Sequence, residues 1–99
     1  VLEAMKPEAY LINASRGPTV DEEALIAALK ENKIAGAGLD VFDQEPPATD
    51  NPLFSLDNVV LTPHVAGFTD EGKRRMGVTA AEDILRVLRG EKPVYPVTS

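Results

Sequence analysis

The sequence predicts an α/β fold in which short parallel strands form one sheet and helices pack against it. Short apolar runs alternate with segments of helical pattern along the chain, and this alternation is typical of right-handed βαβ units. Each apolar run also ends near a polar residue of a kind used in catalysis. In parallel α/β folds ligands bind beyond the carboxyl ends of the strands, so the chain has the pattern expected of an enzyme domain.

The first third of the chain is expected to hold one strand and one helix. Residues 9–13 form an apolar run that predicts a buried strand, and Pro7 separates it from a helix end over residues 1–5. Residues 22–31 follow a helical pattern, with Asp21 as a suitable N-cap and acids in the first turn. The apolar stripe of this helix consists of Leu25, Ala28 and Leu29.

Two further strands and a long loop are expected in the middle of the chain. Residues 34–41 are apolar and small, which favours a central strand, and Gly36 and Gly38 are expected to let a helix lie close to the sheet. Residues 43–56 contain three prolines and predict a loop long enough to be functional. The next strand is expected over residues 58–61.

A long helix is expected over residues 69–89. Thr69 can cap its first turn, and Gly90 can terminate it. Its apolar stripe consists of Gly77, Ala80, Ala81, Ile84, Leu85 and Leu88. Small residues on the stripe suit close packing against another helix or domain, and an exposed stripe of this kind favours pairing between copies of the chain.

The composition argues against several classes of protein. The 99 residues include 16 acidic and 10 basic side chains, a formal charge of −6, whereas nucleic-acid binding needs a clustered positive surface. No apolar run approaches the ~20 residues that span a bilayer, and the first residues lack the features of a signal peptide, so we expect a cytoplasmic protein with no membrane partner. The chain has no cysteine, which excludes disulfides, thiol catalysis and thiolate metal sites.

Three charged side chains are candidates for a catalytic site: Arg16, Glu45 and His64 each follow one of the apolar runs. An arginine can hold a carboxylate with two hydrogen bonds, and a histidine can transfer a proton near neutral pH. This combination indicates a small anionic substrate and a proton transfer. Each residue alone also has an ordinary structural explanation. A histidine after a strand is often only hydrogen-bonded, a loop acid is often only solvated, and an arginine in a turn can pair with a neighbouring acid.

Three segments around these residues closely resemble the D-isomer-specific 2-hydroxyacid dehydrogenase family. The segments are residues 11–17 (LINASRG), 38–46 (GLDVFDQEP) and 61–67 (LTPHVAG). The similarity extends over nearly all of the chain. It implies that residues 1–99 are the C-terminal half of a Rossmann-like NAD(P)-binding domain, with an interdomain helix over residues 69–89 that returns to a substrate domain and a tail over residues 90–99. We therefore expect a fragment of a longer enzyme.

The resemblance implies an oxidoreductase that transfers a hydride between NAD(P)H and a small 2-keto or 2-hydroxy acid. In this mechanism His64 is the acid and base that exchanges a proton with the substrate oxygen, and Glu45 accepts a hydrogen bond from the other ring nitrogen. Arg16 binds the substrate carboxylate and polarises the adjacent carbonyl. The formate dehydrogenase branch uses glutamine as the partner of its histidine, so a glutamate here favours hydroxy or keto acids as substrates.

The cofactor implied by the resemblance is NAD or NADP, and no metal is implied. The residues beside the nicotinamide would be Ala14, Ser15, Arg16, Asp40, His64, Val65, Ala66 and Gly67. Among them Asp40 would bind the nicotinamide carboxamide, although a turn or cap at the strand end also explains an acid there. The chain has no G-x-G-x-x-G motif, so the pyrophosphate loop and the ribose-binding acid that separates NAD from NADP are expected upstream.

Two other functions stay open on the sequence alone. The C-terminal binding proteins, which are NAD-sensing corepressors, share this scaffold with its arginine, glutamate and histidine, so a binding protein without turnover is one alternative. The other is an inactive proteolytic fragment. For the chain by itself we expect no useful NAD(H) affinity and no turnover. For the intact protein we expect a homodimer, which is common in the family.

Overall fold

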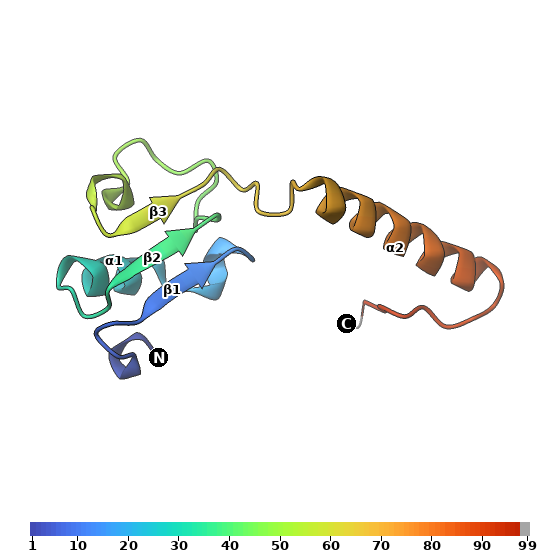
Figure 1. Cartoon of the computed structure of the whole chain (residues 1–99), viewed down its shortest axis with the longest axis horizontal. Helices are drawn as coiled ribbons and strands as arrows, with labels where there is room; N and C mark the ends of the chain where they lie inside the picture. The colour runs from blue at the N-terminus through green and yellow to red at the C-terminus, as the bar shows by residue number, and fades with distance from the viewer. Residues whose placement is uncertain (98–99) are drawn as a thin grey trace. The chain divides into compact units, whose positions relative to one another are not determined.

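The computed structural model describes residues 1–97, which form two compact units. The first unit extends to Ala66 and contains a three-stranded parallel sheet with one α-helix packed against it (Figure 1). The second unit begins at Gly67 and contains one long α-helix and the segment that follows it. The parallel α/β architecture predicted from the sequence is therefore confirmed in the first unit.

All strands of the sheet are parallel, in the order β1-β2-β3, so the predicted central strand is in the middle. The strands are β1 (Tyr10–Asn13), β2 (Gly36–Leu39) and β3 (Val59–Leu61). Asn13 pairs with Leu39, which pairs with Leu61, so the three strands end at the same level. The segments that leave these ends therefore start side by side, at what is here named the carboxyl edge of the sheet.

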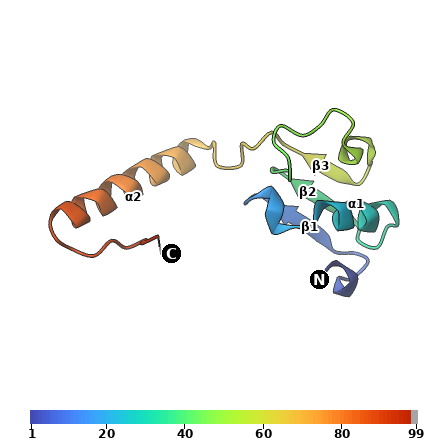
Figure 2. The same cartoon turned by 180° about the vertical axis from the view of Figure 1, so that it is seen from behind.

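The helix α1 (Glu22–Lys30) covers one face of the sheet. It lies behind the strands in Figure 1 and in front of them in Figure 2, where the view is reversed. Asp21 caps its first turn, with Oδ1 accepting a hydrogen bond from the amide of Ala24 at 3.0 Å. After the helix Asn32 adopts a left-handed φ of 52°, which asparagine tolerates. The buried cluster of the unit consists of Leu25, Leu29, Ile34, Ala37, Leu39, Phe42 and Leu53.

The opposite face of the sheet is uncovered within the first unit. Tyr10, Ile12 and Val60 are exposed on it, Ile12 to 72%. The burial predicted for the run 9–13 is therefore wrong for alternate residues of β1. The physical reason is that successive side chains of a strand point to opposite faces, and in this unit α1 packs on only one of them.

Gly36 and Gly38 of β2 pair with Tyr10 and Ile12 of β1. A Cβ atom on Gly38 would lie 2.9 Å from Cδ1 of Ile12, and one on Gly36 would lie 2.5 Å from the carbonyl oxygen of Asn58. The two glycines leave room for atoms of the neighbouring strands and their connections. These atoms belong to the uncovered face, so the prediction that the two glycines admit a closely packed helix stays a prediction.

The proline-rich loop after β2 is attached to the core and to the start of α1. Short 3-10 turns in the unit are η1 (Leu2–Ala4), where a helix end was expected, η2 (Gly17–Thr19) and η3 (Pro52–Ser55). Leu53 of η3 lies in the buried cluster. The carboxylate of Glu22, the first residue of α1, accepts hydrogen bonds from the amide of Asp43 at 2.9 Å and the side-chain amide of Asn51 at 3.0 Å. The loop is therefore held at both ends.

The second unit is built on α2 (Asp70–Leu88), close to the predicted range 69–89. Thr69 caps the helix, because its Oγ1 accepts a hydrogen bond from the amide of Gly72 at 2.9 Å. Gly90 follows the helix with a left-handed φ of 80°, which is the usual role of a glycine at this position. Both predicted ends of the helix are therefore confirmed.

The segment after α2 runs back along the helix within the second unit (Figure 2). The carboxylate of Asp83 holds it there by accepting hydrogen bonds from the amides of Val94 at 2.8 Å and Tyr95 at 2.9 Å. The large residues of the predicted apolar stripe are exposed, Leu88 to 77%. No helix among residues 1–97 is long and apolar enough to cross a membrane.

Candidate active site

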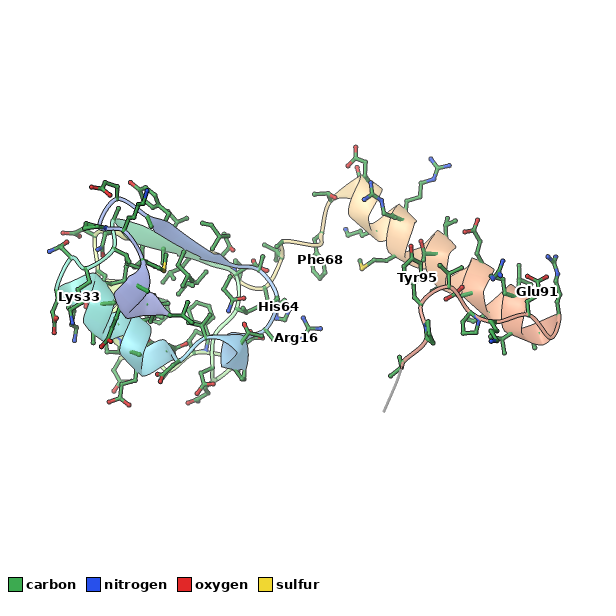
Figure 3. All side chains as sticks on the ribbon, turned by 90° about the horizontal axis from the view of Figure 1, so that it is seen from below. Arg16, Lys33, His64, Phe68, Glu91 and Tyr95 are labelled. Atoms are coloured by element: carbon green, nitrogen blue, oxygen red, sulfur yellow. The ribbon has the colours of Figure 1, made fainter. Side chains whose placement is uncertain are left out.

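The structure brings the three charged candidates to the carboxyl edge of the sheet. Arg16 follows β1, Glu45 lies in the loop after β2, and His64 follows β3. Figure 3 shows the side chains of Arg16 and His64 at the same end of the first unit. All three residues belong to this one unit, so a single compact body defines their arrangement.

Glu45 and His64 form a direct contact. Oε2 of Glu45 lies 2.7 Å from Nδ1 of His64, and Oε1 accepts a hydrogen bond from the amide of Phe42 at 3.1 Å. The hydrogen bond with His64, followed by that from Phe42, lowers the pKa of Glu45. Because an ionised carboxylate only accepts hydrogen bonds, Nδ1 carries the proton. In the neutral ring Nε2 therefore keeps its lone pair and can accept a proton.

The turn that carries His64 has an unusual backbone. His64 has a φ of 56°, in the left-handed region that costs a residue with a Cβ atom about 1–2 kcal/mol. The carboxylate of Asp40 binds this turn through three groups. Oδ1 accepts hydrogen bonds from the hydroxyl of Thr62 at 2.6 Å and the amide of Val65 at 2.8 Å, and Oδ2 accepts one from the amide of Ala66 at 2.9 Å. Asp40 thus caps the turn after β3, whereas the sequence offered a turn or cap at the end of its own strand.

Asn13 organises the loop after β1, and the sequence interpretation missed it. Its side chain is 6% exposed, and its Nδ2 donates a hydrogen bond to the carbonyl of Arg16 at 2.9 Å. Its Oδ1 accepts hydrogen bonds from the amide of Ser15 at 3.1 Å and the hydroxyl of Ser15 at 2.9 Å. The hydroxyl of Thr19 also donates to the carbonyl of Arg16, at 2.6 Å. The sequence feature that could have identified Asn13 is its position as a polar residue at the end of an otherwise apolar run.

The loops that carry Arg16 and Glu45 are in close contact. A Cβ atom on Gly17 would lie 1.8 Å from the carbonyl oxygen of Phe42, so only glycine lets the two loops approach this closely. Nη1 of Arg16 donates a hydrogen bond to the carbonyl of Ser15 at 2.7 Å. No acid within residues 1–97 lies at ion-pair distance from Arg16, although its charge contributes to the lowered pKa of Glu45. The guanidinium can therefore receive an external anion.

The other predicted site residues lie next to these groups. Ala14 and Ala66 are small and exposed, and Val65 is exposed to 39%. These residues lie at the carboxyl edge of the sheet, beside Arg16 and His64. Gly67 is the first residue of the second unit. In the described part of the chain, no three metal-binding side chains are grouped to hold an ion.

A sequence profile described as "D-isomer specific 2-hydroxyacid dehydrogenase, NAD binding domain" matches residues 1–66. The glyoxylate reductase of Thermofilum pendens is 56% identical over 92 residues, which are 93% of this chain and 27% of that protein.

Two solved structures of dehydrogenases or reductases are also similar to this chain. A D-isomer specific 2-hydroxyacid dehydrogenase from Xanthobacter autotrophicus Py2, in complex with NADPH and MES, is 42% identical with a TM-score of 0.83, over 98% of this chain and 39% of that one. An NADPH-dependent glyoxylate/hydroxypyruvate reductase from Sinorhizobium meliloti, in complex with NADP and malonate, is 40% identical with a TM-score of 0.78, over 98% of this chain and 31% of that one. The chain thus spans 27% to 39% of the length of these three relatives.

Proposed function

Because this chain belongs to the D-isomer specific 2-hydroxyacid dehydrogenase family, we propose that it is the part of an NAD(P)-dependent oxidoreductase that holds the nicotinamide and carries the catalytic acid and base. The reaction interconverts a small 2-keto acid and its 2-hydroxy acid, as the names of the glyoxylate and hydroxypyruvate reductase relatives suggest. When bound, the cofactor supplies or accepts the hydride. The residues of this chain handle the proton and the negative charge of the substrate.

The contact between Glu45 and His64 is the observation that carries this proposal. With Nδ1 donating to the carboxylate, Nε2 of the neutral ring takes the hydroxyl proton of a 2-hydroxy acid. In the reverse direction, Nε2 of the protonated ring donates that proton to the keto oxygen. The carboxylate stabilises the imidazolium in both directions. The side chains of His64 and Glu45 are 48% and 36% exposed, so a substrate can reach the pair.

Arg16 binds the carboxylate of the substrate in this proposal. Its guanidinium is exposed and uses Nη1 for the carbonyl of Ser15, so other N–H groups are available for an anion. A guanidinium fork can hold a carboxylate with two parallel hydrogen bonds, which orients the keto group as well as binding it. The close contact at Gly17 keeps the Arg16 loop beside the loop that carries Glu45.

We also propose that the chain supplies only one half of the dinucleotide site and belongs to a homodimeric protein. A G-x-G-x-x-G loop at a helix N-terminus normally neutralises the pyrophosphate, and this sequence has none. The chain alone should therefore bind NAD(H) too weakly for calorimetry to detect at micromolar concentration. Micromolar NADH binding by the 99-residue chain would contradict this division of the site.

A chimera tests the catalytic proposal directly. The chain would replace the matching segment of the Thermofilum pendens glyoxylate reductase, to be assayed with glyoxylate, hydroxypyruvate and 2-ketoglutarate and with NADH or NADPH. His64→Ala should lower kcat at least about 100-fold by removing the proton carrier. Lys33→Ala, in an exposed ion pair with Glu31, is the control and should keep full activity. Turnover that survives His64→Ala would contradict the proposal. Cofactor binding without turnover in the unmodified chimera would instead favour an NAD-sensing binding protein.

A further inference from the structure

Asp40 is held rigidly by the sheet although its side chain is charged. The residue follows the central strand β2 and is only 5% exposed. Its amide donates a hydrogen bond to the carbonyl of Asn13 at 2.9 Å, which continues the β1–β2 ladder one residue beyond the end of β2. On the other side, the amide of Thr62 donates to the carbonyl of Leu39 at 3.0 Å and continues the β2–β3 ladder. Aspartate is rarely buried in this way unless its carboxylate is fully used.

The groups that the Asp40 carboxylate binds lie on both sides of His64. The hydroxyl of Thr62 precedes the histidine, and the amides of Val65 and Ala66 follow it. The hydroxyl of Thr62 makes the largest contribution to lowering the pKa of Asp40, and the two amides lower it further against the effect of desolvation. The carboxylate is therefore ionised at neutral pH and can accept all three hydrogen bonds.

His64 needs this support because of its backbone. Its φ of 56° is disfavoured for a residue with a Cβ atom. The direction of the Cα–Cβ bond depends on this conformation, and so does the contact between Nδ1 and Oε2 of Glu45. A turn that relaxed to a negative φ would aim the ring elsewhere.

We propose that Asp40 is a positioning residue that sets the direction of the His64 ring by binding the turn on both sides of it. The inference rests on the proposed function, since the ring matters for turnover only if His64 is the acid and base. It gives Asp40 a role that is independent of any contact with the nicotinamide. The geometry of the imidazole depends on this carboxylate even when no cofactor is bound.

Nuclear magnetic resonance of the 99-residue chain tests the proposal without substrate or cofactor. His64 is the single histidine of the chain, so its ring nitrogen signals are identified directly. In Asp40→Asn an NH2 group replaces one acceptor oxygen, so the turn loses at least one hydrogen bond. Amide exchange at Val65 and Ala66 should become about 10-fold faster or more, while exchange in α1 stays unchanged. The ring should also change from the Nδ1–H tautomer toward the mixture of free imidazole. Asp50→Asn makes the same chemical change in an exposed loop and should leave both signals unaltered.

Two variants of Thr62 separate positioning from a direct cofactor contact. Thr62→Val removes the hydroxyl and leaves the Asp40 carboxylate in place, whereas Thr62→Ser keeps the hydroxyl. Thr62→Val should shift the amide exchange and the tautomer in the same direction as Asp40→Asn. Thr62→Ser, which keeps the hydroxyl, should leave both as they are in the unmodified chain. In the chimera, Thr62→Val should lower kcat while the Kd for NADH stays unchanged.

The outcomes that overturn the inference differ from those that overturn the proposed function. Unchanged amide exchange at Val65 and Ala66, or an unchanged tautomer of His64, in both Asp40→Asn and Thr62→Val would show that Asp40 does not position the ring. An increase in the Kd for NADH with no loss of kcat in Thr62→Val would also contradict it. Should Asp40→Asn fail to fold, the Thr62→Val and Thr62→Ser pair gives the decision. An inactive unmodified chimera would contradict the proposed function, and the resonance measurements would still decide the role of Asp40.

Discussion

Oε2 of Glu45 lies 2.7 Å from Nδ1 of His64, and the other oxygen of the same carboxylate binds the amide of Phe42 at 3.1 Å. The second hydrogen bond fixes the direction of the first, because it leaves the carboxylate little freedom to rotate. A full negative charge is thus kept in contact with the ring, where it can stabilise an imidazolium formed during proton transfer.

Glu45→Gln should lower the kcat of the chimera about 10-fold or more, because the amide keeps the shape of the carboxylate but removes the charge that stabilises the imidazolium formed during proton transfer. Steady-state kinetics of keto-acid reduction and hydroxy-acid oxidation measure this loss. Glu23→Gln, on an exposed position of α1, is the matched control. An unchanged kcat in both directions would show that Glu45 is not the electrostatic partner of His64.

Acid should destabilise the first unit through Asp40 and Glu45. The pKa of Asp40 is lowered from 3.8, chiefly by the hydroxyl of Thr62, and that of Glu45 from 4.5, chiefly by the hydrogen bond with His64. The unfolded chain therefore binds each proton at a higher pH than the folded chain, so this stabilisation is present at pH values above the unfolded pKa values and is lost as the pH falls through the folded ones.

Urea unfolding between about pH 3 and pH 7 measures this loss of stability. Glu45→Gln should show a smaller fall in the free energy of unfolding over this range than the unmodified chain. In Asp50→Asn, which lies in the exposed part of the same loop, the free energy of unfolding should fall as much as in the unmodified chain. Equal falls in Glu45→Gln and the unmodified chain would contradict the prediction.

Gly17→Ala should lower the free energy of unfolding of the first unit by about 2 kcal/mol or more. The added Cβ atom would lie 1.8 Å from the carbonyl oxygen of Phe42, so the two loops would have to separate. Gly77→Ala is a matched control, because nothing lies within 4 Å of the added atom and alanine favours the helix by up to about 1 kcal/mol. Thermal unfolding compares the two variants, and a Gly17→Ala chain as stable as the original would contradict the close contact of the loops.

The exposed stripe of α2 should cause the isolated chain to self-associate. Ile84, Leu85 and Leu88 are exposed on this helix, and burying them between copies removes apolar surface from water. Ala81→Glu places a charge within the stripe and should shift the population toward monomer in sedimentation at tens of micromolar. Ala48→Glu adds the same charge in an exposed loop and should leave the association unchanged. An unmodified chain that sediments as a monomer would refute this prediction.

Arg16→Lys should weaken keto-acid binding in the chimera, with a KM raised about 10-fold or more, because an ammonium group cannot form the two parallel hydrogen bonds of a guanidinium. The Kd for NADH should change little. Arg75→Lys, on an exposed position of α2, serves as the control in steady-state kinetics. An unchanged KM for every keto acid would show that Arg16 does not hold the substrate carboxylate.

Elements whose signals are local could be predicted from the sequence. The start of α1 follows from Asp21 and the acids after it, and the ends of α2 follow from Thr69 and Gly90, since capping involves residues within one turn. The burial of β1 could not be predicted in the same way. An apolar run does not show whether one or both faces of its strand are covered, because that depends on helices elsewhere in the fold.

The candidate site shows the same limit. Arg16, Glu45 and His64 could be chosen from their positions after apolar runs and from the family resemblance, but the contact between Glu45 and His64 joins residues 19 positions apart. The roles of Asn13 and Thr62 were missed because each works by holding other residues of the site. Only the register of the strands brings Thr62 beside Asp40, 22 positions away in the chain.

The hydrogen bonds of Glu22 link the mobility of the proline-rich loop after β2 to that of α1. Glu22 is the first residue of α1, where the positive end of the helix dipole stabilises a negative charge. Its carboxylate also binds the amide of Asp43 and the side chain of Asn51. A loop opening that released both partners would leave this carboxylate without them and would loosen the first turn of the helix. Residues inserted at the two attachment points should therefore fray α1, because they would displace the amide of Asp43 or the side chain of Asn51.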